Sequence, residues 1–449
     1  MKTNPNVFIH ETDRDAMQAL KAIPGFSQVT KSFLNSWSEK MMYMENIASN
    51  IRITDEQLPK YKAMLKPICE KLGIEEPDLF LKLDVVPNAY TSGDTRPFIV
   101  MTTGLLDTIP EELIPTVLAH ECGHIACHHV LYRTMGTMIL NGALSLIPLG
   151  AIAIYPIMSA FANWMRCSEL SADRAAALCD GTPDKVVEMC MRFAGFNKKI
   201  AGEMNKDAFL AQAEEYKKLV KESTWNKTLE YMRFSQLTHP INAIRACECL
   251  DWAASEEYEK AVQCFAAWER NEDPAELPLS ISPKSQNGKD PETVKKELED
   301  LGFRNVTLKA SGNGSVFTRE HSVISVAVNE SSQFREGQWI RTDTPIEIRY
   351  YEKGREEVRT ASGTAAMINS DRYYTGMDHD LAVKQLSHIG FTNVHTEPVC
   401  DIEEASDPLL NKVITITVGT NVIFRSGDTF PADIEIRILY HDMMKGTAR

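Results

Sequence analysis

The sequence lacks low-complexity tracts and has no stripe of basic residues. Lysine and arginine number 48 against 62 aspartate and glutamate residues, so the formal net charge is -14 over 449 residues. Proteins that bind nucleic acid usually carry a basic face that neutralises phosphates. The charge balance therefore excludes a nucleic-acid partner, and 43% hydrophobic residues is the composition of a globular protein.

A secretory signal and a disulfide framework are also missing. Residues 1–11 are polar and have no apolar core of the kind that a signal peptide needs. The ten cysteines are scattered without the paired spacing of a disulfide framework. These absences predict reduced thiols in a cytoplasmic protein. Cys247 and Cys249 are separated by one residue, which is poor zinc-finger spacing, so a metal site there is the weaker alternative.

One pentapeptide can build a metal site: His120-Glu121-Cys122-Gly123-His124. Two histidines four residues apart lie on one face of a helix, so both imidazoles can reach one metal ion. The glutamate beside the first histidine can face the water on that metal, and Zn²⁺ fits such ligands with one position open for water. A string of this type arises by chance in about one chain per hundred of this size, so its surroundings must decide.

Hydrophobic periodicity and turn residues predict the elements around the pentapeptide. The motif helix should begin near Ile114, because Pro115 suits a first helical turn. Other helices are expected over 26–51, 59–72, 167–177, 183–193, 207–221 and 241–268, and strands over 79–86 and 97–103, with a turn over 88–94 between them.

Residues 134–165 contain no charged side chain and are the one membrane candidate. A membrane-spanning helix needs roughly 20 apolar residues, but Asn141-Gly142, Pro148 and Pro156 interrupt the stretch. If Glu169 binds the same metal as the two histidines, both ends of the stretch lie on one side of a membrane. We therefore expect a helical hairpin that packs on protein or makes a peripheral membrane contact, with a full membrane span as the weaker alternative.

The C-terminal part contains an internal repeat. Leu301-Gly302-Phe303-Arg304-Asn305-Val306 corresponds to Ile389-Gly390-Phe391-Thr392-Asn393-Val394, and the later strands correspond in the same order. Each copy is predicted to be one helix followed by alternating strands, a small α+β module. The copies resemble PASTA-like modules, although the usual opening Val-Pro is absent. We expect them to bind a protein partner or to regulate the rest of the chain.

Residues 25–270 resemble the zinc metallopeptidase family that includes HtpX, the Oma-type proteases and the CAAX prenyl protease. The resemblance rests on Asn88-Ala89-Tyr90, the segment 99–106, the pentapeptide, Glu169 with Asp173-Arg174, and His239-Pro240 with Arg245. It implies an α+β chain with a mainly helical, zincin-type catalytic domain of the gluzincin type and a small sheet. The expected domains are 1–278 (peptidase), 279–289 (linker), 290–353 (repeat 1), 354–377 (linker) and 378–443 (repeat 2).

The resemblance also implies the metal site. His120, His124 and Glu169 would bind one Zn²⁺ per chain, with Glu121 as the general base that activates the zinc-bound water. Asp173 would orient a histidine from outside the ligand shell, with a plain salt bridge to a neighbour as the alternative. His128 continues the line of the two motif histidines, and we expect it on the helix surface or outside the ligand shell.

Substrate contacts follow from the same resemblance. His239 and Arg245 would polarise the carbonyl or hold the oxyanion, although the His-Pro turn could equally cap a helix. The strand 97–102 resembles an edge strand that pairs with extended substrate, which gives affinity through backbone hydrogen bonds. The expected substrate-binding residues are Asn88, Ala89, Phe98, Ile99, Val100, Met101 and Thr102.

The leading hypothesis is a zinc endopeptidase that hydrolyses unfolded, damaged or membrane-associated proteins. Two alternatives are a latent peptidase gated by its repeats, and a non-catalytic zinc-binding protein that acts through the repeats. The presence of Glu121 and only three evident protein ligands favours the first, because an open position is typical of a catalytic site.

Overall fold

The structure is a computed structural model of the whole chain. It describes residues 3–36, 38–140, 151–195, 200–222, 242–283, 285–312, 318–352, 364–367, 369–402, 404, 406–419, 423–432 and 434–443. The chain divides into two compact units. One comprises residues 1–286, 292–307 and 326–347, and the other comprises 287–291, 308–325 and 348–449.

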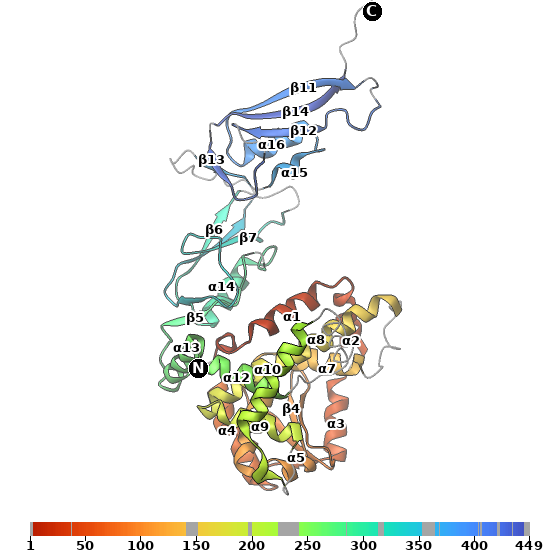
Figure 1. Cartoon of the computed structure of the whole chain (residues 1–449). Coiled ribbons are helices and arrows are strands. Elements are labelled where there is room, and N and C mark those ends of the chain that lie inside the picture. The colour runs from red at the N-terminus through yellow and green to blue at the C-terminus, as the bar shows by residue number, and fades with distance from the viewer. Residues whose placement is uncertain are drawn as a thin grey trace, which may run out of the picture. The chain divides into compact units, whose positions relative to one another are not determined.

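The first unit is mainly helical (Figure 1). Its helices up to the motif are η1 (Pro5–Val7), α1 (Glu11–Ala22), α2 (Phe26–Ser36), α3 (Glu39–Ser49), α4 (Pro59–Leu72), α5 (Thr103–Thr108), η2 (Glu111–Leu113) and α6 (Ile114–Ala126). Those after the motif are α7 (Val130–Leu140), α8 (Ala151–Asp180), α9 (Asp184–Gly195), η4 (Ala201–Glu203), α10 (Lys206–Glu222), α12 (Asn242–Ala253) and α13 (Glu256–Glu269).

Most predicted helices are confirmed, but two of them are each divided into two shorter helices. The predicted start of α6 at Ile114 and both ends of α4 agree with the structure. The helix expected over 241–268 is divided into α12 and α13, because the Ser255 side chain accepts a hydrogen bond from Tyr258 N and starts a new helix. Ser38 starts α3 in the same way, with Met41 N as donor, and so divides the helix expected over 26–51.

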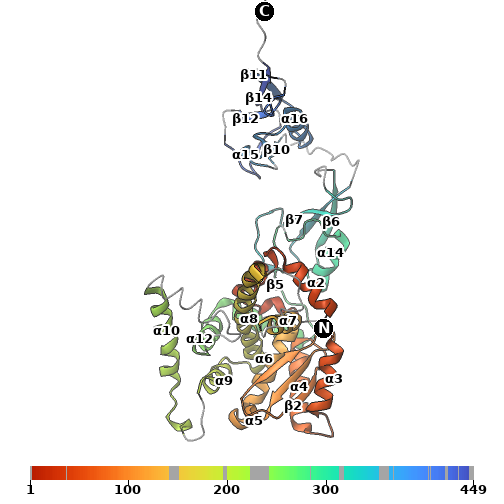
Figure 2. The same cartoon turned by 90° about the vertical axis from the view of Figure 1, so that its right-hand side faces the viewer.

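A four-stranded sheet covers one side of the motif helix. Its strands are β1 (Ile51–Ile53), β2 (Asp78–Lys82), β3 (Ala89–Ser92) and β4 (Phe98–Thr102), in the order β1-β2-β4-β3. The strands lie beside α3 and α4 (Figure 2), and β3 packs against α6.

The prediction that 97–102 is an edge strand is wrong. β4 pairs with β2 in parallel and with β3 in the antiparallel direction, so both of its edges are occupied. The edge strand next to β4 is β3, which follows Asn88, and β1 forms the opposite edge. The turn predicted over 88–94 is a strand from Ala89 to Ser92, although the Asn, Ser, Gly and Asp residues of this segment favour a turn.

The described part of the apolar stretch packs on protein. α7 and the first half of α8 share one core with α1 and α2. This core contains Ala16, Leu20, Phe26, Val29, Phe33, Met135, Ile139, Ile157, Phe161, Trp164 and Met165. Residues 141–150, where the hairpin would turn, lie outside the described residues. Within the ranges that the structure describes, no helix is both long and apolar enough to cross a membrane.

The two repeats have the same architecture. Repeat 1 contains α14 (Pro291–Asp300), β6 (Val306–Ser311), β7 (Val323–Val328), β8 (Trp339–Arg341) and β9 (Ile346–Tyr351); repeat 2 contains α15 (Asp371–Tyr374), α16 (His379–His388), β11 (Val394–Ile402), β12 (Val413–Val418), β13 (Thr429–Pro431) and β14 (Ile436–Met443). Their sheets have the orders β6-β9-β7 and β11-β14-β12. Gly302 and Gly390 both have φ +107°, which explains why glycine stands after each helix.

Each repeat also uses a short strand from the segment before it. β5 (Glu276–Pro278) pairs with β8, and β10 (Thr364–Ala366) pairs with β13. Leu279 and Ile281 are buried, and so are Met367 and Tyr374. The described residues of the segments predicted as linkers, 279–289 and 354–377, therefore contribute to packed modules. Residues 284, 353–363 and 368 are not among the residues that the structure describes.

We predict that His10 makes this fold less stable in acid. Its side chain accepts a hydrogen bond from Thr12 N at the start of α1. Burial, followed by Arg174, lowers the pKa of His10 to about 3. The unfolded chain therefore binds a proton in the window from pH 6.5 down to 3 that the folded chain does not, and stability falls as the pH falls through it.

The test compares wild type with His10→Asn, which keeps a capping oxygen but does not titrate. Between pH 6.5 and 5.5, wild type should lose about 1 kcal/mol more unfolding free energy than the variant, as measured by urea denaturation. Equal pH dependence of the two proteins would contradict the prediction.

Candidate active site

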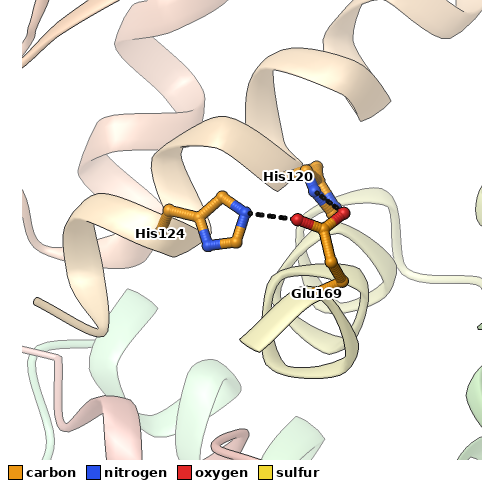
Figure 3. A group of neighbouring side chains, drawn as sticks. All are labelled: His120, His124 and Glu169. Carbon is orange, nitrogen blue, oxygen red and sulfur yellow. Dashed lines mark ion pairs between the residues drawn. The ribbon is translucent and has the colours of Figure 1, made fainter. Parts of the chain in front are cut away.

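The two motif histidines and Glu169 converge on one point (Figure 3). α6 carries His120 and His124 one turn apart, and α8 carries Glu169. Glu169 Oε2 lies 3.5 Å from His120 Nε2, and Glu169 Oε1 lies 3.5 Å from His124 Nε2. One potential ligand atom of each residue lies within 4.8 Å of the others, and all three side chains are buried. In the part of the chain that the structure describes, this is the one cluster with metal-ligand geometry.

Small residues allow α6 and α8 to approach closely enough for this convergence. A Cβ at Gly123 would lie 2.8 Å from Ala175 Cβ and 3.1 Å from Ala172 Cα, which real Cβ atoms do not tolerate without a shift. Any larger residue at 123 would therefore push the helices apart. The glycine of the pentapeptide is needed to keep Glu169 within reach of both histidines.

Asp173 and Arg245 lie behind His120. His120 Nδ1 lies 2.9 Å from Asp173 Oδ1, and Arg245 holds Asp173 through Nε at 2.8 Å and through a second nitrogen at 2.6 Å. Burial alone would lower the pKa of His120, but hydrogen bonds to Asp173 and Glu169 outweigh it and raise this pKa to about 9. A metal ion would take the place of that proton, because a ligating imidazole is neutral.

The surroundings of His124 differ from those of His120, because the Nδ1 atom of His124 meets an imidazole rather than a carboxylate. Its Nε2 is buried without a hydrogen-bond partner, and its Nδ1 lies 3.1 Å from His129 Nδ1. Burial and the charge of Arg133 lower the pKa of His124 well below the usual value, so this imidazole is neutral. A neutral imidazole with an unpartnered nitrogen facing a carboxylate is suited to a metal ligand.

The charge of the site also fits a divalent cation. Asp13, Glu121, Glu169 and Asp173 are buried carboxylates. The guanidinium groups that meet them belong to Arg133, 2.8 Å from Glu169 Oε1, and Arg245, 3.4 Å from Glu169 Oε2. When His120 is neutral, as a metal ligand must be, four carboxylates and two guanidinium groups leave a net charge of -2. A buried charge needs a partner, and a Zn²⁺ ion held by His120, His124 and Glu169 would supply it.

Glu121 points toward the sheet. Its Oε2 accepts a 2.6 Å hydrogen bond from Thr91 Oγ1, which also lies 3.3 Å from the Glu121 backbone oxygen. Thr91 belongs to the edge strand β3. The edge strand is thus directly connected to the glutamate of the pentapeptide.

The predicted site residues divide into three groups. His120, Glu121, His124, Glu169, Asp173 and Arg245 come together, and Asn88 and Ala89 lie at the start of the edge strand. Phe98, Ile99, Val100, Met101 and Thr102 are buried in the central strand β4. His239 lies outside the described residues.

The sequence did not reveal several residues of the site. α6 ends at Ala126 and His128 adopts φ +56°, so His128 turns to solvent and His129 turns inward. The exposure of His128 agrees with its expected place on the surface, but the helical period did not predict that His129 is buried. Arg133 was visible only as the charge that precedes the apolar stretch, and Asp13 and Thr91 gave no signal at all.

This geometry predicts metal-dependent stability. At a zinc concentration 100 times Kd, wild type should gain about 2.7 kcal/mol and unfold at a temperature several degrees higher. His124→Ala should lose this gain. The exposed His128, four residues further along the chain, provides the matched control, because His128→Ala should keep it. A thermal shift retained in His124→Ala would rule out the site.

Comparison with known proteins identifies the family. A model described as Peptidase family M48 matches residues 56–253. Plastoglobule-localized metallopeptidase 48 of Arabidopsis thaliana is 36% identical over 259 residues, which are 57% of this chain and 75% of that protein. Protease HtpX homolog 2 of Methanosarcina mazei is 22% identical over 193 residues, 37% of this chain and 65% of that protein.

Among solved structures, the three-PASTA-domain region of a Ser/Thr kinase from Staphylococcus aureus aligns at 14% identity with a TM-score of 0.16, covering 39% of this chain and 68% of that one. The similarity to the Arabidopsis metallopeptidase extends over three quarters of that protein, and the family match over 56–253 contains His120, His124 and Glu169. The chain belongs to peptidase family M48 and is a zinc metalloprotease.

Proposed function

We propose that the chain is an endopeptidase that cleaves unfolded polypeptides at the His120–His124–Glu169 centre, with one Zn²⁺ per chain. The convergence of these three buried side chains is the observation that carries the proposal. Bound there, the ion would supply Lewis-acid activation of a water molecule and of the scissile carbonyl. Three protein ligands leave a position open, as catalytic zinc sites require.

Glu121 is the proposed general base. It lies next to His120 in the chain, and its Oε2 is held by Thr91 on the side of the edge strand. A carboxylate in this place can take a proton from the attacking water and deliver it to the leaving amine. Asp173 and Arg245 are proposed to orient His120, since each of the contacts described for Arg245 is with His120 or a carboxylate of the site.

Glu121→Gln should lower the rate of cleavage of an unfolded protein such as casein by about 10²- to 10⁴-fold, because the base is lost. Zinc affinity should stay close to that of wild type. Glu112→Gln, an exposed change of the same charge, is the control and should cleave normally. Full zinc-dependent cleavage by Glu121→Gln would overturn the role of Glu121. Zinc binding without cleavage in wild type would instead favour a non-catalytic zinc protein.

Substrate is proposed to add to the sheet beside β3. In the register with β4, Thr102 N donates to Asn88 O, and Tyr90 pairs with Val100 two residues further along. Backbone groups alternate along an antiparallel pair, so those of Ala89 and Thr91 face the free edge. An extended peptide could pair with them, and Thr91 would place it beside Glu121.

The loop before β3 presents apolar side chains to solvent. Leu83, Val85 and Val86 are 86%, 87% and 61% exposed. The loop is nevertheless fixed through its backbone, because Asp84 O accepts from Gly104 N at 2.8 Å and Val86 O accepts from the Thr102 hydroxyl at 2.8 Å. A fixed loop with exposed apolar side chains that leads into the substrate edge favours unfolded polypeptides, which display apolar residues.

We predict that the double variant Leu83→Ser/Val85→Ser raises KM for unfolded casein by about 5- to 10-fold, the equivalent of roughly 1 kcal/mol of lost apolar contact. The value of kcat for a short polar peptide should not change. Ile423→Ser, at a residue that is 79% exposed in the second unit, is the control. An unchanged KM in the double variant would contradict a role for the loop.

The compartment and the partner of the repeats remain proposals. All ten cysteines are free thiols, which supports a reducing, cytoplasmic compartment. The core shared with α1 and α2 buries six residues of the apolar stretch, which supports packing on protein over a peripheral membrane contact for that part. They are Met135, Ile139, Ile157, Phe161, Trp164 and Met165. The repeats are proposed to bind a protein partner.

A further inference from the structure

His124 is connected to the N-terminal helix α1 through a second histidine. His124 Nδ1 lies 3.1 Å from His129 Nδ1, and His129 Nε2 lies 3.0 Å from Asp13 Oδ2. Asp13, His124 and His129 are all buried, with at most 4% of each exposed. His120 is different, because its Nδ1 meets the carboxylate of Asp173 directly.

Two facing Nδ1 atoms require one donor and one acceptor. If His124 binds metal through Nε2, its proton must sit on Nδ1 and is donated to His129 Nδ1. His129 must then carry its own proton on Nε2, from which it donates to Asp13. With both imidazoles neutral and Asp13 ionised, one arrangement of protons satisfies all three residues, and it is the arrangement in which His124 Nε2 is free to ligate.

Asp13 is well fixed as the acceptor at the end of this series. Trp164 Nε1 donates to its Oδ1 at 2.8 Å, and the Ser171 hydroxyl donates to its Oδ2 at 2.5 Å. Burial would raise the pKa of Asp13, but His129, Ser171 and Trp164 outweigh it and hold the pKa below the usual value. The carboxylate is therefore ionised and accepts hydrogen bonds on both oxygens.

We propose that Asp13 and His129 are positioning residues of the metal centre, which fix the tautomer and orientation of His124 for ligation through Nε2. The inference rests on the proposed metal site and adds to it a helix that lies before the segment matched to the family, residues 56–253. α1 packs along α8, the helix that carries Glu169. The N-terminal helix thereby completes the metal centre.

Asp13→Asn is a sharp test because the amide has one donor side and one acceptor side. Trp164 Nε1 needs the acceptor side, so the Asn NH₂ faces His129 Nε2 and turns that nitrogen into an acceptor. His129 would then carry its proton on Nδ1, and His124 would carry its proton on Nε2, where the metal binds. We expect zinc Kd, measured by competition with a chromophoric chelator, to rise about 10- to 100-fold.

The control is Asp15→Asn, an exposed change of the same charge on the same helix, which should leave Kd unchanged. His129→Gln can accept from His124 with its carbonyl and donate to Asp13 with its amide, so it should keep most of the affinity. His129→Leu should lose it. Adding Asp13→Asn to His129→Leu should cause no further loss, because the two residues act in series. Urea unfolding of each metal-free variant separates these effects from loss of fold.

Several results would overturn the inference. They are equal Kd values for Asp13→Asn and Asp15→Asn, equal losses in His129→Gln and His129→Leu, or additive losses in the double variant. Failure of the proposed function would look different, because wild type itself would then fail to bind zinc or to cleave casein.

Discussion

The negative charge buried around His120 and His124 is the constraint on which the rest of the first unit depends. Carboxylates inside a protein must be paired, and loss of one partner of a buried pair costs about 3–5 kcal/mol. Here the partners come from separate helices. Asp13 lies on α1, Arg133 on α7, Glu169 and Asp173 on α8, and Arg245 on α12. The helices must therefore meet at this point for any of these charges to be satisfied.

Close packing makes that meeting possible. Gly123 lies against Ala172 and Ala175, so α6 and α8 approach at the level of the proposed ligands. Trp164 fills the core beside α1 and also donates to Asp13. Apolar packing and polar pairing thus depend on the same residues. α1 takes part in a further contact, since Gln18 Nε2 donates to Glu336 Oε2 of repeat 1 at 2.6 Å. One helix therefore touches both the surroundings of the metal centre and the first repeat.

The sequence allowed the local part of this arrangement to be predicted. Spacing placed His120 and His124 on one face, Pro115 placed the start of α6, and family resemblance supplied Glu169. The pairing of Asp13 with His129 joins residues 116 positions apart, and no local pattern encodes such a contact. The order of the strands failed for the same reason: the apolar run 98–102 shows a buried strand but does not show that Ala89–Ser92 covers its edge.

The corrected edge changes how substrate and base are related. If substrate paired with β4 instead, it would lie one strand further from the pentapeptide. The substrate-binding strand would then make no contact with Glu121, because the contact of Glu121 is with Thr91 of β3. With β3 at the edge, the residue whose backbone would face the proposed substrate is also the residue whose hydroxyl holds Glu121 Oε2 at 2.6 Å. A peptide that pairs with Thr91 would therefore be aligned by the same strand that orients the proposed base. The strand β3 would therefore position both the bound peptide and the group that transfers its proton.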